Sequence, residues 1–293
     1  MPKKQTKLNK HEVKILDTLY HKMYKSLPNK HVDIFLCGGD VNKDTTRKNV
    51  RNILKNIDFL MIFFPEKIFI EYFNLNKEAD YLTLETILAE NVDYICIVCE
   101  SPGAYAELGA FVNNKNLQNK IIVLNDEQYK NDPSFINLGP IKHLKKVNKT
   151  AVRYYNDNTL CKVCDKLQRF FKQHLDKTKE PRSIDKITGM FYFITLILYL
   201  FKGLAKNTLY LYIKYLTDGI KNKAIDFNFD ATYSATIKIL FNENFIKNKN
   251  LNEIELTKTG KDFIYKLIHN NPKAVYNDVI SDIIWYKFYH YSS

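Results

Sequence analysis

Short apolar runs that alternate with helical segments are the feature that most constrains how this chain folds. The runs are VDIFLCGG (32–39), IDFLMIFFPE (57–66), YICIVCESPG (94–103) and KIIVLND (120–126), with TAVRYYND (150–157) as a candidate fifth. Helical patterns separate or follow them at residues 44–56, 81–93, 104–114 and 160–175. Strands that are apolar nearly throughout and alternate with helices form a parallel sheet covered on both faces. The sequence therefore predicts an α/β domain built on a doubly wound parallel sheet.

The chain has 293 residues, more than one domain usually contains, so we expect a second domain. The segment KTKEPRSID, residues 177–185, is charged, contains Pro181 and lacks apolar periodicity, which is typical of a linker. We therefore expect a sheet domain over residues 1–176, opened by a helix near His11–Lys25, and a smaller domain over residues 186–293.

The smaller domain has the order of elements of a winged helix-turn-helix. Helical stretches at 187–201 and 206–222 precede a further helix at Thr232–Phe241, a hairpin with its tip at Asn248–Asn252, and a helix after LTKTG. In a winged helix-turn-helix the helix at 232–241 enters the major groove. Lys238, Lys247 and Lys249 are then the nucleic-acid contacts. Because three lysines make a thin basic face, a dimerisation module with the same outline remains an alternative.

The net charge of +12 is spread unevenly along the chain. Residues 1–30 carry a net +6 and residues 142–186 a net +8, whereas residues 31–141 carry a net −6. Basic flanks of this kind attract polyanions, and phosphate contacts then make binding dependent on salt. Ordinary solvation of lysines is the alternative interpretation.

The longest apolar run, MFYFITLILYLF (190–201), has 12 residues, whereas a membrane span needs about 20. It predicts a buried helix. The sequence opens without the pattern of a signal peptide, so we expect a cytoplasmic protein that does not contact a membrane. An odd number of cysteines, five, in such a protein indicates reduced thiols rather than a disulfide framework.

Two CxxC pairs, Cys96/Cys99 and Cys161/Cys164, raise the question of a zinc site. Residues three apart in a strand point to opposite faces, so the first pair is unsuited to chelation. The second pair lies in a helical pattern where a cysteine usually serves packing. We therefore expect neither a metal ion nor a cofactor.

Polar residues gather where the predicted strands end. In doubly wound sheets ligands bind beyond the carboxyl ends of the strands, and Gly38, Gly39, Asp40, Glu100 and Glu107 fall there. Glycines lack a Cβ atom and allow the backbone to approach a ligand closely. Neither a dinucleotide-binding glycine pattern nor a P-loop is present. We expect a substrate to contact the residues of these two turns, namely Cys37, Gly38, Gly39, Ser101, Pro102, Gly103 and Tyr105.

Glu107 is the most informative of these residues because its neighbours from Ala104 to Phe111 are nearly all uncharged. A carboxylate in apolar surroundings is costly unless it is used. Such a carboxylate can attack the anomeric carbon of a sugar and form a covalent intermediate. A second acidic group should assist the leaving group, and Glu85 and Asp40 are the candidates. A helix-capping or salt-bridged Glu107 is the alternative, and Tyr105 could stack on a base or fill the core.

These residues carry a resemblance to a known family. IFLCGGD, LETILAENVDYICIVCESPGAYAELGAF and IIVLND are similar to the nucleoside 2-deoxyribosyltransferase-like family. More narrowly, ESPGAYAELGAFVNNKNLQNK and SFINLGPIKHLKK resemble the deoxyribosyltransferase-like effectors of bacterial retron antiphage systems, which add a winged-helix DNA-binding domain. The resemblance covers most of residues 31–150, and over the C-terminal part it depends on architecture alone.

The resemblance implies a toxin-like N-glycosidase that cleaves a nucleoside or nucleotide, with NAD as a candidate substrate. It gives Glu107 the role of nucleophile and the Gly38-Gly39-Asp40 turn that of sugar binding, and Glu85 lies near the position of a family acidic residue. It also implies that a reverse transcriptase and its branched RNA–DNA product (msDNA) hold the protein, and that copies of the chain assemble. The choice between transfer and hydrolysis stays open, as does a non-catalytic nucleotide-sensing DNA-binding regulator.

Overall fold

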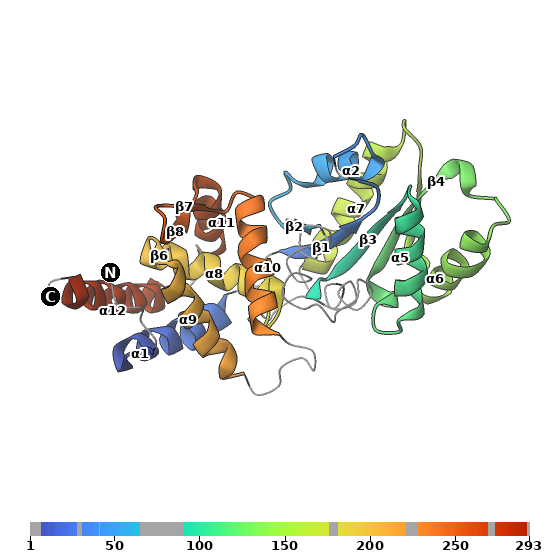
Figure 1. Cartoon of the computed structure of the whole chain (residues 1–293). Coiled ribbons are helices and arrows are strands. Elements are labelled where there is room, and N and C mark those ends of the chain that lie inside the picture. Colours follow the sequence, from blue (N-terminus) through green and yellow to red (C-terminus); the bar gives the residue numbers. More distant parts are fainter. Residues whose placement is uncertain are drawn as a thin grey trace. The chain divides into compact units, whose positions relative to one another are not determined.

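The structure, a computed structural model, describes residues 7–27, 31–40, 42–64, 89, 91–175, 181–220, 228–268 and 273–291. They fall into two compact units (Figure 1). The first, called the sheet unit below, comprises Lys30–Phe73 and Lys77–Thr178. The second, called the helical unit, comprises Met1–Asn29, Asn74–Asn76 and Lys179–Ser293. The division differs from the expected boundaries because the N-terminal residues group with the C-terminal ones.

The sheet unit contains the predicted parallel sheet of five strands. They are β1 (Val32–Cys37), β2 (Leu60–Phe63), β3 (Tyr94–Cys99), β4 (Ile121–Asp126) and β5 (Val152–Tyr155). All neighbouring strands run parallel, in the order β2-β1-β3-β4-β5. The order reverses between β1 and β3, and ligands bind at such a reversal in doubly wound sheets. The predicted α/β class and parallel sheet are confirmed.

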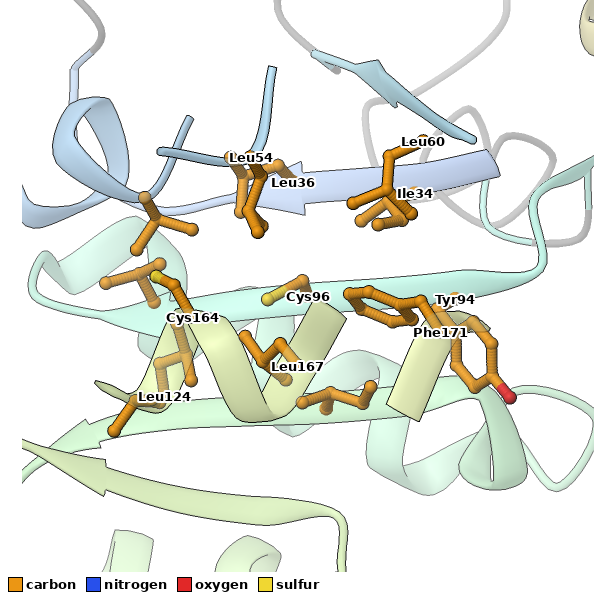
Figure 2. Packing of buried hydrophobic residues seen from close by; sticks show 14 of the residues in the cluster. Ile34, Leu36, Leu54, Leu60, Tyr94, Cys96, Leu124, Cys164, Leu167 and Phe171 are labelled. Atoms are coloured by element: carbon orange, nitrogen blue, oxygen red, sulfur yellow. The ribbon is translucent and has the colours of Figure 1, made fainter. Parts of the chain in front are cut away.

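Helices cover both faces of this sheet. Helices α2 (Thr46–Leu54) and α7 (Leu160–Leu175) pack on one face, where their apolar side chains join those of β1, β3 and β4 in one buried cluster (Figure 2). Helix α5 (Pro102–Asn113) covers the other face, where the ring centroids of Phe35 and Phe111 lie 6.4 Å apart. The connection from β4 to β5 contains η4 (Glu127–Tyr129), η5 (Asn137–Ile141) and α6 (Lys142–Val147), and η3 (Gln118–Lys120) precedes β4.

The cysteines follow this division between the two faces. Cys96 of β3 and Cys164 of α7 both lie in the buried cluster between α7 and the sheet (Figure 2). Cys99 is three residues beyond Cys96 in the same strand and points to the α5 face, while Cys161 is exposed. The two CxxC pairs therefore do not converge on one point.

The helical unit combines the N-terminal segment with the C-terminal residues (Figure 1). Its elements are α1 (Lys10–Thr18), η1 (Leu19–Met23), η2 (Tyr24–Ser26), α8 (Ile187–Phe201), β6 (Leu204–Ala205), α9 (Lys206–Asp218), α10 (Phe229–Asn242), β7 (Ile246–Asn248), β8 (Glu253–Leu256), α11 (Lys258–Ile268) and α12 (Lys273–Tyr291). The three strands form an antiparallel sheet in the order β6-β8-β7. Helix α8 is buried along almost its whole length, which confirms the prediction for the apolar run at 190–201. Among the described residues, the helices are all too short or too polar to cross a lipid bilayer.

Glu12 explains why the N-terminal segment belongs to the helical unit. Its side chain is 1% exposed, and Oε1 accepts hydrogen bonds from the hydroxyls of Tyr212 (2.9 Å) and Tyr286 (2.8 Å). Its Oε2 accepts one from the backbone nitrogen of Asn9, which completes a capping box at the start of α1. A buried carboxylate needs such partners, so this glutamate fixes α1 against α9 and α12.

Candidate functional site

The loops that follow β1 and β3 are joined by one carboxylate. Glu100 accepts hydrogen bonds at Oε1 from the backbone nitrogens of Gly39 and Arg47, both at 2.9 Å. Its Oε2 accepts a third from the backbone nitrogen of Thr46 at 2.6 Å. Thr46 and Arg47 are the first residues of α2, whose N-terminal N–H groups lack partners within the helix. Glu100 therefore orients the β1–α2 loop.

The two glycines of the CGGD turn make room for protein atoms. A Cβ atom on Gly38 would lie 2.9 Å from Cβ and from Cδ of Arg47, and the φ angle of Gly38 is +156°. A Cβ atom on Gly39 would lie 3.0 Å from Oε1 of Glu100. The buried guanidinium of Arg47 donates to the carbonyl of Gly39 (3.1 Å) and lies over the Phe64 ring. The close approach that these glycines allow is thus made by Arg47 and Glu100.

The turn Ser101-Pro102-Gly103 begins α5. The Ser101 hydroxyl accepts a hydrogen bond from the backbone nitrogen of Ala104 (3.2 Å) and donates one to the carbonyl of Gly38 (3.5 Å). Pro102 occupies the first helical position, where its fixed φ angle fits and no N–H group is needed. This turn is therefore adjacent to the CGGD turn, as expected for two loops at one edge of the sheet.

Glu107 lies in the second turn of α5, on the face of the helix that meets the sheet. Its side chain is half-buried and its Oε2 atom is buried. The pKa of the Cys99 thiol is raised to about 12, first by burial and then by the negative charge of Glu107, so the two groups are close. The helix dipole acts mainly within the first turn, so it stabilises a charge on Glu107 only weakly.

Tyr105 and Cys37 border the same region. The Tyr105 hydroxyl donates to the backbone carbonyl of Cys99 at 3.1 Å, which fixes its ring over the end of β3. Burial raises the pKa of Tyr105, and the charges of Cys99, Tyr129 and Asp126 raise it further. Cys37 is fully buried at the end of β1.

The candidates for the second acidic group are Asp40 and Glu85, of which the structure describes Asp40. Asp40 is exposed, and its Oδ1 accepts from the backbone nitrogen of Asn42 at 2.9 Å, which stabilises its own turn. Glu85 lies outside the described residues. Asp40 stands at the expected edge of the sheet, but its carboxylate serves the turn.

Asn125 is a residue of this edge that the sequence analysis did not single out. It lies at the end of β4, is 2% exposed, and pairs in register with Cys99 of β3 and with Tyr154 of β5. Residues paired across parallel strands point to the same face, so Cys99, Asn125 and Tyr154 form a row on the α5 side. Among the described residues, Oδ1 of Asn125 accepts no hydrogen bond. The signal in the sequence was an amide that interrupts the apolar run IIVL.

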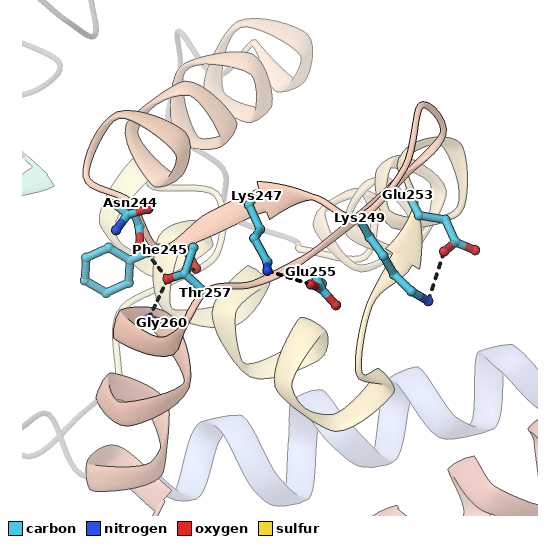
Figure 3. Close-up of polar contacts among 8 residues, drawn as sticks. All are labelled: Asn244, Phe245, Lys247, Lys249, Glu253, Glu255, Thr257 and Gly260. Carbon is cyan, nitrogen blue, oxygen red and sulfur yellow. Dashed lines mark hydrogen bonds and ion pairs between the residues drawn. The ribbon is translucent and has the colours of Figure 1, made fainter.

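The hairpin of β7 and β8 carries two of the three proposed nucleic-acid contacts (Figure 3). Lys247 forms an ion pair with Glu255 (3.2 Å), and Lys249 forms one with Glu253 (3.1 Å). The Thr257 hydroxyl donates to the carbonyl of Asn244 (2.6 Å), which fixes the base of the hairpin. Two of the proposed basic contacts are therefore neutralised by neighbours in the same hairpin.

The third proposed contact, Lys238, is half-buried on α10. A cavity of about 630 Å³ also lies within the helical unit, lined by residues that include Asp17, Tyr20, Arg182 and Tyr215. This cavity is separate from the row at the ends of the sheet strands. We take the ends of the sheet strands as the candidate site, because Glu107 lies close to Cys99 there and Cys99 pairs in register with Asn125.

Comparison with known proteins assigns the chain to a family. A family model described as "STM3845 retron effector protein" matches residues 43–248. The "Retron Ec86 putative ribosyltransferase/DNA-binding protein" of Escherichia coli is 38% identical over 167 residues, which are 55% of this chain and 54% of that relative. The corresponding protein of retron Ec73, also from Escherichia coli and with the same description, is 36% identical over 121 residues, 37% of this chain and 36% of the relative.

The chain thus spans about half of the first curated relative and about a third of the second. Because the family model matches more than half of its residues, the chain belongs to the STM3845 retron effector family.

Proposed function

We propose that the protein is a retron effector toxin of antiviral defence whose sheet unit cleaves the N-glycosidic bond of a nucleotide, with Glu107 as the nucleophile. NAD is a candidate substrate. Membership of a retron effector family and the description of two relatives as ribosyltransferases support a reaction at the anomeric carbon of ribose. The nucleoside deoxyribosyltransferase-like fold remains part of this proposal, supported by the parallel sheet and by the place of Glu107 in α5.

One observation carries the proposal: Glu107 lies beside Cys99 at the end of β3, with Oε2 buried. This is the edge at which doubly wound sheets bind ligands. A carboxylate held away from bulk water is a stronger nucleophile than a hydrated one, since it does not have to shed water before it attacks. The hydrogen bonds of Glu100 hold the neighbouring loop in place, so the surroundings of Glu107 are pre-ordered.

The proposed reaction has two steps. A carboxylate oxygen of Glu107 attacks C1′ of the ribose, the bond from C1′ to the base nitrogen breaks, and the base leaves with the electron pair of that bond. Water then attacks C1′, loses a proton to solvent or to a second acidic group, and releases Glu107 as a carboxylate. Most bases need a proton to leave, for which Glu85 and Asp40 remain the candidates. The cationic nicotinamide of NAD leaves as a neutral ring and needs none.

The helical unit is proposed to be a winged-helix domain. Its order of elements from α8 to β8 supports this, because a helix, a short strand, two helices and a hairpin follow one another and the strands form a three-stranded sheet. The description of the relatives as DNA-binding proteins supports contact with DNA. A reverse transcriptase and its msDNA as binding partners, and assembly of several copies of the chain, are further parts of the proposal.

Replacement of the nucleophile tests the proposed reaction. The purified wild-type protein and its Glu107→Gln and Glu107→Ala variants are incubated with nucleosides, nucleotides and NAD, and released bases are separated by chromatography. We expect base release by the wild type and at least a 1000-fold loss in both variants, since a nucleophile has no substitute. Asp165→Asn, which removes an exposed carboxylate from α7, serves as the control and should retain full activity. Cleavage by a folded Glu107→Gln protein at the wild-type rate excludes the proposed role.

The alternative function is a nucleotide-sensing regulator that binds DNA without catalysis. The hairpin of β7 and β8, which is the proposed wing, offers little basic surface for DNA binding, because its two lysines form ion pairs with glutamates. Protection of a specific duplex by the protein, in the absence of any turnover of nucleosides, nucleotides or NAD, would favour the regulator.

A further inference from the structure

Two lysines converge on one tyrosine at the β5 end of the candidate site. The Nζ atom of Lys145, on α6, lies 3.0 Å from the Tyr154 hydroxyl and 5.0 Å from the centroid of its ring. The Nζ atom of Lys130, which follows η4, lies 5.5 Å from the same centroid. Both lysines are exposed and Tyr154 is half-buried. Two positive charges are thus held at one aromatic ring.

No carboxylate compensates these two charges within the part of the chain that the structure describes. Of the acidic side chains near in sequence, Asp126 accepts from Gln128, and Glu127 accepts from Asn156 at 2.7 Å. Asp132, two residues from Lys130, forms no ion pair with either lysine within the described residues. In the hairpin of β7 and β8, by contrast, Lys247 and Lys249 each form an ion pair with a glutamate. Two like charges brought together without a counter-ion repel each other, and an anion between them would remove that cost.

The lysines belong to the same edge as Glu107. Tyr154 pairs in register with Asn125, and Asn125 pairs with Cys99, which is adjacent to Glu107. Neighbouring strands lie about 4.8 Å apart, so Cys99 and Tyr154 are separated by about 10 Å. The ribose and the phosphate of one nucleotide can bridge such a span. Asn125 lies between them with a buried amide oxygen that accepts no hydrogen bond within the described residues, so the strip is polar along its length.

We propose that Lys130, Lys145 and Tyr154 form a phosphate subsite of the candidate active site, so that the substrate is a nucleotide or dinucleotide and not a free nucleoside. The inference depends on the proposed function for the position of the sugar. Lys145 and Lys130 hold the phosphate by charge-assisted hydrogen bonds, and the Tyr154 hydroxyl fixes the direction of Lys145. The phosphate then positions the ribose with C1′ toward Glu107.

The test compares nucleosides with their 5′-monophosphates as ligands. Binding is measured by calorimetry on the full chain with Glu107→Gln, which prevents turnover, for the four common bases, and for NAD against nicotinamide riboside. We expect the phosphorylated member of the preferred pair to bind at least about tenfold more tightly, as charge-assisted hydrogen bonds to two lysines imply. The double substitution Lys130→Ala and Lys145→Ala should abolish that preference and leave the affinity for the nucleoside unchanged.

A matched control removes the same charge from the same region. Lys142 and Lys146 are exposed lysines of α6, and neither contacts Tyr154. Lys142→Ala with Lys146→Ala should keep the preference for the phosphorylated ligand. Equal losses in the two double variants, a loss of nucleoside affinity in the first, or no preference for phosphate in any pair would each overturn the subsite.

Failure of the subsite and failure of the proposed reaction give different results. If the protein prefers monophosphates through Lys130 and Lys145 but wild-type protein releases no base, the subsite stands and the cleavage reaction fails. If nucleosides and nucleotides are cleaved at equal rates and Glu107→Gln abolishes both, the reaction stands and the subsite fails.

Discussion

The Oε1 atom of Glu100 lies 2.9 Å from the backbone nitrogen of Gly39, and this contact joins the ends of the neighbouring strands β1 and β3. The same carboxylate accepts from the first two N–H groups of α2. A residue at the mouth of the candidate site thus serves the architecture, a role distinct from the one proposed for Glu107.

Glu100→Ala should destabilise the protein, because three backbone N–H groups lose their acceptor. Loss of a helix cap together with a charge-assisted hydrogen bond costs about 2–3 kcal/mol of the free energy of unfolding. Glu100→Gln keeps one side-chain oxygen and should cost about 1 kcal/mol. Urea denaturation followed by circular dichroism measures both values. Asp165→Ala on the exposed side of α7 is the control, and a loss for Glu100→Ala no larger than that of the control would contradict the bridging role.

Two glycines near the site should respond to alanine in opposite directions. Gly38→Ala places a Cβ atom 2.9 Å from Arg47 at a φ angle of +156°, so we expect a loss of about 1–3 kcal/mol. Gly109 lies inside α5, and a Cβ atom there meets no atom of the described structure within 4 Å. Gly109→Ala should therefore raise the free energy of unfolding by up to about 1 kcal/mol.

Activity assays on the same pair give further information. If a substrate occupies the space beside Gly109, Gly109→Ala lowers base release although the protein is more stable. A Gly109→Ala protein that is both less stable and fully active would contradict both expectations.

The stability of the protein should fall above about pH 9. Burial, followed by the charge of Glu107, raises the pKa of Cys99 from 9.0 to about 12 in the folded state. The unfolded thiol therefore loses its proton first, and the stability that Cys99 contributes is present below pH 9 and is lost as the pH rises toward 12. One such group changes the free energy of unfolding by at most about 1.4 kcal/mol per pH unit.

Urea unfolding of the wild type and of Cys99→Ala at pH 8, 9, 10 and 11 isolates this contribution. The variant should show a shallower decline, since the other buried thiols and tyrosines are common to both proteins. Cys161→Ala removes an exposed thiol and should decline as steeply as the wild type. Parallel declines for wild type and Cys99→Ala would exclude a raised pKa at this position.

The strands were predictable from sequence and the contacts between the loops were not. Runs such as VDIFLC and YICIVC are apolar on both faces, and a buried parallel strand is the structure that suits them. The position of Glu107 near the end of a strand could be predicted from the apolar run that precedes it. The role of Glu100 could not be predicted, because its three hydrogen-bond donors lie more than 50 residues earlier in the chain.

The neighbours of the N-terminal segment were not evident from sequence for a similar reason. Its helix was expected from local pattern, but its place in the helical unit depends on hydrogen bonds from Tyr212 and Tyr286 to Glu12, some 200 residues away and more. Likewise, the sequence does not distinguish Lys130 and Lys145 from other surface lysines. Their place at the candidate site depends on their contacts with Tyr154 and on the register that pairs Tyr154 with Asn125. Local sequence patterns predict helices and strands, whereas the residues that meet at a site depend on contacts between segments far apart in the sequence.

The last prediction concerns the ion pairs of the β7–β8 hairpin. Lys247 and Lys249 form ion pairs with Glu255 and Glu253, so the hairpin offers a phosphate backbone little net charge (Figure 3). Glu253→Gln with Glu255→Gln frees both lysines. If the hairpin contacts DNA, this variant should bind a duplex more tightly, and the plot of log affinity against log salt should steepen by up to about 2, since each phosphate neutralised contributes about 0.9. Fluorescence anisotropy at several salt concentrations measures the slope.

Asp165→Asn with Asp157→Asn in the sheet unit, which removes the same charge elsewhere, is the control. An unchanged slope for the hairpin variant, or an equal change in the control, would show that the hairpin does not contact DNA and would favour the interpretation of the helical unit as a dimerisation module.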